Sequence, residues 1–467
     1  MDPLALPILK RLPLAEAVLL VWSWIAEDRF LQELFHGHRG RCYERVIAFP
    51  VLVQLIADAL LQYDGSANHS FEKAQERDEL TASIAAAYGK LRRLPIPLSM
   101  AFLAGCTDRL RALFPAVTAT PVADSLKDLQ IIVYDGKAIK RVAKRLKRLR
   151  GVRGGLLGGR ALVALDLASG LAVAMHAHPD GEANDVRFVP DLLPPVRQRI
   201  AGPRLHVADR QFCDLKQMAA FTAETGDHFL VRYHPKVHFH RDDTRPVREG
   251  QDRHGRRYLE EWGWLGRPEH KLRRYVRRIT LVRPEEEAVI LVTDLLDADH
   301  YPATDLLEVY LSRWGIERLF QQVTEVFGLG GLIGGSPQAT IFQFAFCMVL
   351  YNLIQVIRAY VAAATARPVE TISTEKVFED VTEELTAWTK LIEPQTTVLL
   401  FAEPLPLAVL RQRLRGLLQG VWSDRWQKAP ARKRRGTTKQ GKRTHGSVYR
   451  ILEDHRRRQK IAQKCGP

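Results

Sequence analysis

Hydrophobic residues recur at helical spacing throughout the first quarter of the chain. Four stretches carry apolar side chains three or four positions apart, with prolines between or after the last two; the stretches are 14–34, 46–61, 82–94 and 98–114, and the breaks are Pro95, Pro97 and Pro115. No strong strand pattern occurs in this part of the chain. The pattern predicts a helical N-terminal region over residues 1–125.

A different pattern begins at Leu129, where short β-rich runs replace the helical spacing. QIIVYDGK predicts a strand ended by Asp-Gly, ALVALDLASGLAVAMHAH predicts two strands joined at Ser-Gly, and RLHVADRQF and DHFLVRY predict two more. GEANDVRFVPDLLPPV and 214–224 predict helices between them, and 305–328 predicts an amphipathic helix after a polar insertion. This order is that of the ribonuclease-H-like fold, in which three antiparallel strands come first and later strands join in parallel.

We therefore expect an α/β fold class: a ribonuclease-H-like mixed-sheet core with a β-rich insertion, flanked by helical regions. The expected units are the helical N-terminal region 1–125, the first part of the core 126–231, the β-rich basic insertion 232–290, the second part of the core 291–365, a helical C-terminal region 366–427 and a basic tail 428–467 that is expected to be flexible. A chain of 467 residues is long enough for roughly two to four structural domains.

The most apolar stretch of the chain, Ile341–Val361, does not favour a membrane span. It contains Gln343, Asn352, Gln355 and Arg358, which a lipid-facing helix rarely tolerates. We expect a buried helix of a soluble protein instead. The five cysteines are scattered without a C-x2-C pair, which favours a reducing compartment. These observations predict a cytoplasmic protein without a membrane partner.

The chain is strongly basic, and its charge is unevenly distributed. Lys and Arg number 69 against 53 Asp and Glu, a net charge of +16 with an isoelectric point near 9.7. The positive side chains gather in 137–160, at Arg273, Arg274, Arg277 and Arg278, and in the tail 428–467. A solvated face and a disordered tail would explain such runs, but three of them favour a nucleic-acid partner. We expect the N-terminal helices to take part in DNA binding.

Three carboxylates fall where the expected core would bring them together. Asp135 ends the first strand, Asp209 ends the fourth, and Glu317 lies in the helix after the insertion. The first and fourth strands are neighbours in this fold, and a helix across the sheet can add the third acid. Clustered carboxylates suit Mg²⁺, and two such ions can stabilise both the attacking and the leaving oxygen of a phosphoryl displacement. Each acid alone has a simpler explanation, as a turn residue, a helix cap or a surface helix residue.

One helix face in this region combines polar side chains with the third acid. Tyr310, Arg313, Glu317 and Thr324 occupy one side of the expected helix. The spacing Tyr-x2-Arg-x3-Glu within YLSRWGIERLF resembles the signature of DDE transposases of the IS-four type of bacterial insertion sequence. DGK and VADRQF are similar to that family's two aspartate motifs, and GEANDVRFVPDLL and VTDLLDADHYPATDLLEVY resemble its connecting segments. The resemblance covers roughly 130–225 and 285–355.

The resemblance implies a DNA transposase with Asp135, Asp209 and Glu317 as catalytic and metal-binding residues. Two Mg²⁺ ions, with Mn²⁺ as an alternative, are the implied cofactors. Double-stranded DNA, both terminal inverted repeats and target, is the implied partner, together with a homodimer in the synaptic complex. The implied reaction hydrolyses the strand ends with water and then joins them to target DNA through the freed 3′-hydroxyl. The candidate DNA-binding residues are Tyr310, Arg313, Lys137, Lys140, Arg141 and Arg210.

Two positions depart from the family's pattern. Thr324 stands where the signature continues with a lysine that contacts DNA phosphate near the cut, and Lys137 replaces the small hydroxyl residue usual after Asp-Gly. Two other functions therefore stay open: an inactive transposase-derived protein that binds DNA, and a ribonuclease-H-like nuclease that cuts without joining. Trp262 and Trp264 in the insertion are candidates either for stacking on an unpaired base or for the core.

Overall fold

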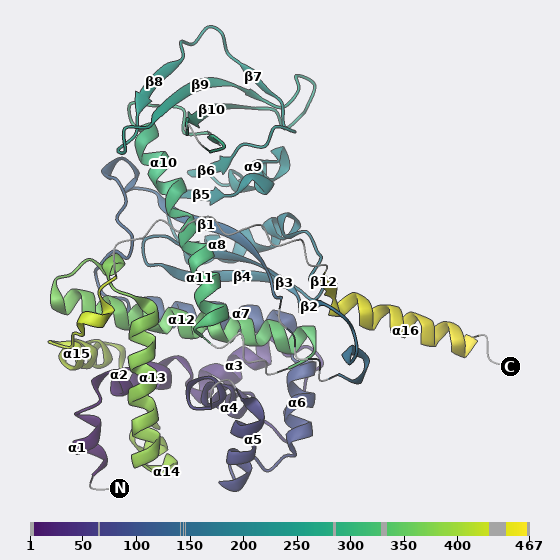
Figure 1. The fold of residues 1–467 in the computed structure, drawn as a ribbon, viewed down its shortest axis with the longest axis vertical. Helices are drawn as coiled ribbons and strands as arrows, with labels where there is room; N and C mark the ends of the chain where they lie inside the picture. Colours follow the sequence, from purple (N-terminus) through teal and green to yellow (C-terminus); the bar gives the residue numbers. More distant parts are fainter. Residues whose placement is uncertain are drawn as a thin grey trace.

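The computed structural model of the chain has a large sheet above a base of helices (Figure 1). The structure describes residues 4–63, 66–140, 142, 144, 146–283, 286–327, 334–428 and 445–464. Ten strands form the sheet, in the order β4-β3-β1-β5-β6-β11-β10-β9-β7, with β8 paired to β9. The five strands of the core are β1 (Gln130–Ala138), β3 (Arg160–Asp166), β4 (Leu171–His178), β5 (Arg204–Ala208) and β6 (Asp227–Arg232).

The core strands have the predicted ribonuclease-H-like arrangement. β1 lies at the centre, antiparallel to β3 and parallel to β5, while β4 pairs antiparallel with β3 and β6 pairs parallel with β5. Side chains alternate between the two faces of a strand, so each face of the sheet has a hydrophobic cluster of its own. Ile131 and Val133 of β1 join the cluster under the sheet, and Ile132 and Tyr134 join the other. The helices α8 (Val189–Arg199) and α9 (Leu215–Phe221) cover this second face.

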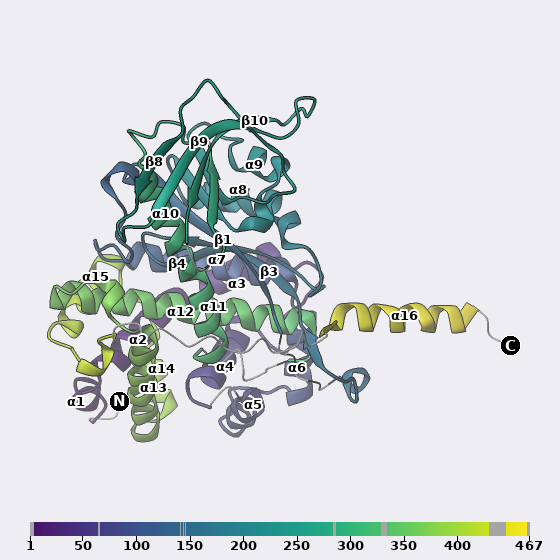
Figure 2. The ribbon, with the colours of Figure 1, turned by 45° about the horizontal axis from the view of Figure 1, so that its top comes forward.

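The polar insertion folds as antiparallel strands that extend the same sheet. β11 pairs antiparallel with the core strand β6, and β10 and β9 follow it outward. These strands form the upper part of the molecule (Figure 2). Their bounds are β7 (Phe239–Arg241), β8 (Arg248–Gln251), β9 (Arg257–Leu265), β10 (Arg274–Leu281) and β11 (Val289–Thr293). Trp262 is buried and donates from Nε1 to the carbonyl of Leu296 at 3.0 Å, whereas Trp264 is 39% exposed.

Helices from both ends of the chain form the base below the sheet. The N-terminal helices are α1 (Ala5–Leu9), α2 (Pro13–Ile25), α3 (Asp28–His38), α4 (Phe49–Leu61), α5 (Ala67–Glu76), α6 (Ile84–Arg93) and α7 (Ile96–Leu113). The C-terminal helices are α12 (Pro337–Thr365), α13 (Thr374–Leu391), α14 (Pro394–Phe401) and α15 (Leu407–Leu418). α12 runs through the middle and packs against α2, α6, α7, α13 and α15. The base therefore packs helices from segments far apart in the chain around the central helix α12.

α12 is the buried helix that the sequence predicts for Ile341–Val361. Within the described part of the chain it is the one helix long and apolar enough to cross a membrane, but it is buried in the fold. Its polar residues have partners: the Asn352 amide accepts from the backbone N–H of Ala172 at 2.9 Å and donates to Thr107 Oγ1 at 2.8 Å. These hydrogen bonds join α12 to β4 and α7, because Ala172 lies on β4 and Thr107 on α7.

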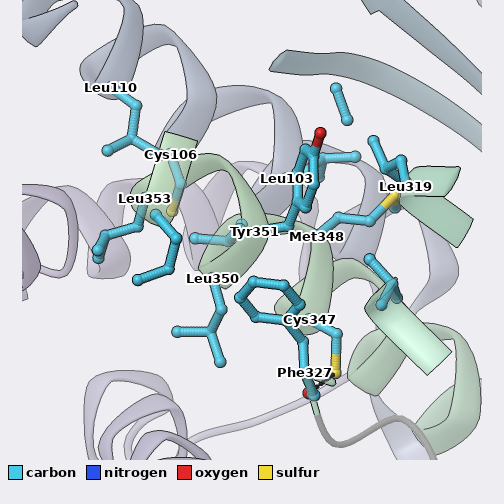
Figure 3. Close-up of a cluster of buried hydrophobic side chains, with 14 of the residues drawn as sticks. Leu103, Cys106, Leu110, Leu319, Phe327, Cys347, Met348, Leu350, Tyr351 and Leu353 are labelled. Carbon is cyan, nitrogen blue, oxygen red and sulfur yellow. Dashed lines mark hydrogen bonds between the residues drawn. The ribbon is translucent and has the colours of Figure 1, made fainter. Parts of the chain in front are cut away.

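The expected continuous helix at 305–328 is two helices. α10 (Ala303–Ser312) and α11 (Trp314–Glu325) meet at Arg313, where the backbone N–H of Arg313 bonds to the carbonyl of Tyr310. This tighter three-residue hydrogen bond, repeated from Ile316 to Arg313, interrupts the α-helical pattern. α11 is anchored from below, since its Leu319 lies in the hydrophobic cluster with side chains of α7 and α12 (Figure 3).

The described end of the tail is ordered, although the sequence analysis expected a flexible tail. β12 (His445–Ser447) pairs parallel with β2 (Gly155–Leu157), and α16 (Val448–Lys464) then leaves the body of the molecule (Figures 1 and 2). Val448 packs with Leu149 and Leu156, and Arg450 Nε lies 2.9 Å from Asp180 Oδ2. The expectation was wrong here because partners distant in sequence hold this segment. Residues 429–444 lie outside the described part.

Candidate active site

Asp135 and Asp209 are neighbours on two parallel strands. Asp209 follows the last residue of β5, as predicted, but Asp135 lies within β1; the prediction that Asp-Gly ends this strand was wrong, because pairing with β3 continues to Ala138. In the β1–β5 pairing, Tyr134 lies opposite Ala208, so the next residue of each chain segment is one of the two aspartates. By the alternation of a strand, Asp135 shares a face with Ile131 and Val133, the face that packs on the base helices. The sheet therefore presents Asp135 toward α11, which contacts β1.

Arg313 and Tyr310 connect the three predicted carboxylates. Arg313 Nη2 donates to Glu317 Oε1 at 2.8 Å, and its Nη1 lies 3.7 Å from Asp135 Oδ2. Tyr310 Oη donates to Asp209 Oδ1 at 3.4 Å. The three acids therefore surround the α10–α11 junction, which supplies both connecting side chains.

The Arg313 guanidinium is buried but only partly hydrogen-bonded. Its side chain is 5% exposed, and its Nε and Nη1 atoms have no hydrogen-bond partner among the described residues. Buried donors without partners are costly, and a guanidinium binds phosphate or carboxylate oxygens through two parallel hydrogen bonds. The free Nε and Nη1 of Arg313 can thus donate to a further oxygen atom between the three carboxylates.

The environment raises the pKa values of Asp135, Tyr310 and Arg313. Burial raises the pKa of Asp135 to about 6; Arg313 and the Gly136 N–H oppose this rise, whereas Glu317 and Asp209 add to it. Burial also raises the pKa of Tyr310 to about 12, so its hydroxyl stays protonated and can donate at neutral pH. Burial alone would lower the pKa of Arg313, but interactions with Tyr310, Asp209 and Asp135 raise it overall. Burial is therefore the main cause of the raised pKa of Asp135, and the neighbouring negative charge adds to it and stabilises cationic Arg313.

The arrangement as it stands is not that of a filled metal site. No group of three or more His, Cys, Asp or Glu side chains in the described ranges is close enough together to hold a metal ion. Arg313, a cation, lies between Asp135 and Glu317 instead. The donor chemistry nevertheless fits a hard divalent cation, because all three groups offer carboxylate oxygens and the charges of Glu317 and Asp209 add to the burial that raises the pKa of Asp135.

Asp185 is a site-supporting residue that the sequence analysis did not identify. Its side chain is 1% exposed, and its Oδ2 accepts from Arg160 Nη2 at 2.7 Å. It lies directly over Gly136, where an added Cβ would approach Asp185 Oδ2 to 1.5 Å. Only glycine therefore fits after Asp135. The sequence signal was the Asp-Gly pair itself, interpreted there as the end of a strand.

The remaining candidate DNA-binding residues differ in exposure and in whether an acid already pairs with them. Arg210 follows Asp209 and pairs with Glu287 Oε1 at 2.5 Å, and Arg232 pairs with the other oxygen of Glu287 at 3.1 Å. Such exposed ion pairs contribute about 0–1 kcal/mol, so a phosphate could replace Glu287 at little cost. Lys140 is exposed and Lys137 is half-buried; the candidate Arg141 lies outside the described residues.

Comparison with protein families gives a match over the core of the chain. Residues 127–353 match the family model described as the transposase DDE domain. The match contains β1, β5 and the α10–α11 junction, and with them all three carboxylates. No curated protein matches the chain significantly. Residues 127–353 therefore belong to the DDE transposase family.

Proposed function

We propose that the chain is the transposase of an insertion sequence of the IS-four type. It binds the terminal inverted repeats of its element, cleaves the strand ends and joins them to target DNA. The observation that carries the proposal is the meeting of Asp135, Asp209 and Glu317 around Arg313 and Tyr310, inside a transposase DDE domain.

The three carboxylates would hold divalent cations, Mg²⁺ or Mn²⁺. When bound, such ions supply charge neutralisation for the attacking and leaving oxygens of a phosphoryl transfer. The side chains of this chain do the rest. Arg313, held at Glu317 through Nη2, would donate through its free Nε and Nη1 to a phosphate oxygen, and Tyr310 would orient Asp209 through the hydrogen bond that its hydroxyl donates. Water attacks first, and the freed 3′-hydroxyl attacks the target phosphate second.

The family implies DNA as the substrate, and transposases are typically soluble cytoplasmic proteins. We propose a homodimer that holds the two ends of the element in one synaptic complex. A basic chain of net charge +16 would gain non-specific affinity for DNA through counterion release.

Cleavage of DNA that carries the sequences flanking the gene tests the proposal. Asp135→Asn, Asp209→Asn and Glu317→Gln should each lower Mg²⁺-dependent cleavage by about 1,000-fold or more while DNA binding stays nearly intact. Asp191→Asn, whose side chain is 66% exposed on α8, is the matched control and should cut normally. Substantial cutting by any of the three variants would remove that residue from the proposed site.

The same assay separates the other two functions. Terminal DNA bound by the wild-type protein but never cut, with Mg²⁺ or Mn²⁺, would indicate a DNA-binding protein without catalysis. The position of Arg313 between Asp135 and Glu317 is the observation that favours this alternative. Strand ends cut but never joined to a supercoiled target would indicate a nuclease. The proposal requires both cutting and joining.

A further inference from the structure

Lys137 lies on the catalytic face of the central strand, two residues after Asp135. Alternate residues of a strand share a face, so Asp135 and Lys137 both face the base helices, with Gly136 between them. The Lys137 ammonium lies 5.5 Å from the centre of the Phe320 ring on α11. Phe320 is three residues after Glu317, on the same side of that helix. Lys137 therefore lies between β1 and α11, beside the acid cluster.

The Lys137 ammonium has no anionic partner. It makes neither an ion pair nor a hydrogen bond with any described residue, although it is half-buried. Burial and then Lys140 lower its pKa, while Asp135 and Glu325 act in the opposite direction. Lys90 shows the usual solution for a buried lysine, since its ammonium donates to the carbonyl of Tyr43 at 2.7 Å. Lys137 is thus a half-buried cation without an anionic partner among the described residues, beside the proposed site of DNA cleavage. A phosphate group of the DNA can supply that partner.

No other side chain of β1 or α11 can provide a cation at this point. Lys137 is the one basic residue of β1, and the one basic residue of α11, Arg318, is exposed. Thr324 lies one turn beyond Phe320, but its hydroxyl donates to the Phe320 carbonyl at 2.7 Å. The Thr324 hydroxyl is thereby engaged by its own helix. Among the side chains of β1 and α11, Lys137 remains for a second anion, besides the one that Arg313 would bind at the helix junction.

The distance between Asp135 and Lys137 along β1 indicates which anion Lys137 can bind. Residues two apart in a strand are separated by about 6.6 Å, which is close to the spacing of successive phosphates along a nucleic-acid strand. With the scissile phosphate at Asp135, the next phosphate falls near Lys137. We propose that Lys137 binds the DNA backbone phosphate adjacent to the one that is cut, and so positions the strand in the site. This inference rests on the proposed function.

A double perturbation tests the contact directly. The first change is Lys137→Met, which keeps the aliphatic stem over Phe320 and removes the charge. The second is an uncharged methylphosphonate at the phosphate adjacent to the cut. Each change alone should slow single-turnover cleavage about 10- to 100-fold, because each removes one charge-assisted contact. Together they should slow cleavage no more than either alone, whereas multiplied losses would overturn the proposal.

Three further variants distinguish a phosphate contact from a structural role. Lys137→Arg should keep most activity, and Thr324→Lys should restore cleavage to Lys137→Met, because position 324 lies one turn beyond Phe320 on the same helix face. Lys216→Met, an exposed lysine of α9, should cut at the wild-type rate. Failure of both Lys137→Arg and Thr324→Lys to support cleavage would contradict the proposal.

The outcome can be separated from that of the proposed function. If the wild-type protein binds terminal DNA but never cuts it, the proposed function fails while the contact can still be measured by equilibrium binding. Lys137→Met should then weaken binding of normal DNA and leave binding of the methylphosphonate DNA unchanged. Equal weakening for both DNAs would refute the contact, with or without catalysis.

Discussion

Two arginine-rich segments of similar composition have opposite surroundings in the fold. β10 and the residue before it carry Arg273, Arg274, Arg277 and Arg278, and α16 carries Arg456, Arg457, Arg458 and Lys460. On β10, Arg277 is fully buried with Nε 2.7 Å from Glu260 and Nη1 2.6 Å from the Tyr301 carbonyl. On α16, these four exposed residues have no ion pair with any described residue, whereas Arg450 in the first turn pairs with Asp180. Similar sets of basic side chains can thus stabilise a fold in one place and remain free in another.

The difference arises from the partner of each segment. β9 runs antiparallel to β10, with Arg278 opposite Glu261 and Glu260 one position away, so acids meet arginines across the strands. Arg274 donates to the Met218 carbonyl at 2.9 Å, and Arg273 lies over the Trp264 ring at 4.4 Å. Among the described elements, α16 has no neighbour beyond its first turns, and it leaves the body of the molecule (Figure 1). The phosphate contacts that the sequence suggested for β10 are therefore not available at Arg277.

The buried pair should give the largest effect. Glu260→Gln leaves the Arg277 charge buried without its carboxylate, which typically costs about 3–5 kcal/mol of unfolding free energy. Glu249→Gln on β8 is the matched control, because its partner Arg257 is 60% exposed and such pairs contribute about 0–1 kcal/mol. Denaturant unfolding of both variants measures the difference. Equal unfolding free energies of the two variants would show that the buried Glu260–Arg277 pair stabilises the fold no more than an exposed ion pair does.

An unpaired acid in the helical base extends the comparison to buried negative charge. Burial raises the pKa of Asp58 on α4 to about 7, against weaker opposing effects of Gln54 and Arg77. The folded chain thus keeps a proton that the unfolded chain loses near pH 4, so stability should fall as the pH rises from about 4 to 7. Asp58→Asn retains an acceptor for Gln54 and removes the ionisable group. We expect the variant to be about 2–4 kcal/mol more stable at pH 8 and nearly unchanged at pH 4.

Unfolding midpoints of both proteins at the two pH values check this prediction. The control is Asp28→Asn, which makes the same substitution at an exposed carboxylate at the start of α3. A constant difference between Asp58→Asn and wild type across the pH range would show that Asp58 is ionised in the fold.

Arg313 combines features of both segments, since it is buried like Arg277 but has free nitrogens. Arg313→Ala should slow single-turnover cleavage of pre-bound terminal DNA by about 100-fold, because a charge-assisted contact to phosphate is lost. Arg318→Ala, from the exposed side of α11, should slow it less than about threefold. A larger loss at Arg318 would mean that α11 presents its other side to DNA.

The sequence predicted those features that depend on local periodicity and chain order. The change from helical to alternating spacing at Leu129 placed the strands of the core, and their order led to the correct sheet. Asp135 and Asp209 could be located because parallel neighbouring strands bring their ends together. Asp185 over Gly136 and Glu287 beside Arg210 could not, because these contacts join different segments without any periodic signal. The catalytic roles of Asp135 and Asp209 and the DNA-binding role of Arg210 remain predictions.

The ordered end of the tail escaped prediction for the same reason. α16 begins where β12 pairs with β2, almost three hundred residues earlier in the chain, and Val448 packs into a small cluster there. The composition of the tail alone predicts a basic segment that cannot form a hydrophobic core. The tail has no core of its own, but it is anchored to the loop between β1 and β3, close to the strand that carries Asp135.

The smallest expected effect concerns the exposed charge of α16. Changing Arg456, Arg457, Arg458 and Lys460 to Gln should weaken non-specific DNA binding about tenfold and reduce its salt slope by about 2–4, because each phosphate contact releases counterions. Preference for terminal DNA over unrelated DNA should not change, since phosphate contacts carry no sequence information. Arg278→Gln on β10 should leave the slope unaltered, because Glu261 already neutralises that arginine at 2.5 Å. Titrations of labelled DNA at several salt concentrations measure all three quantities. An equal drop in slope for Arg278→Gln would show that ion pairing inside the fold does not withhold an arginine from DNA, and the contrast between the two segments would be lost.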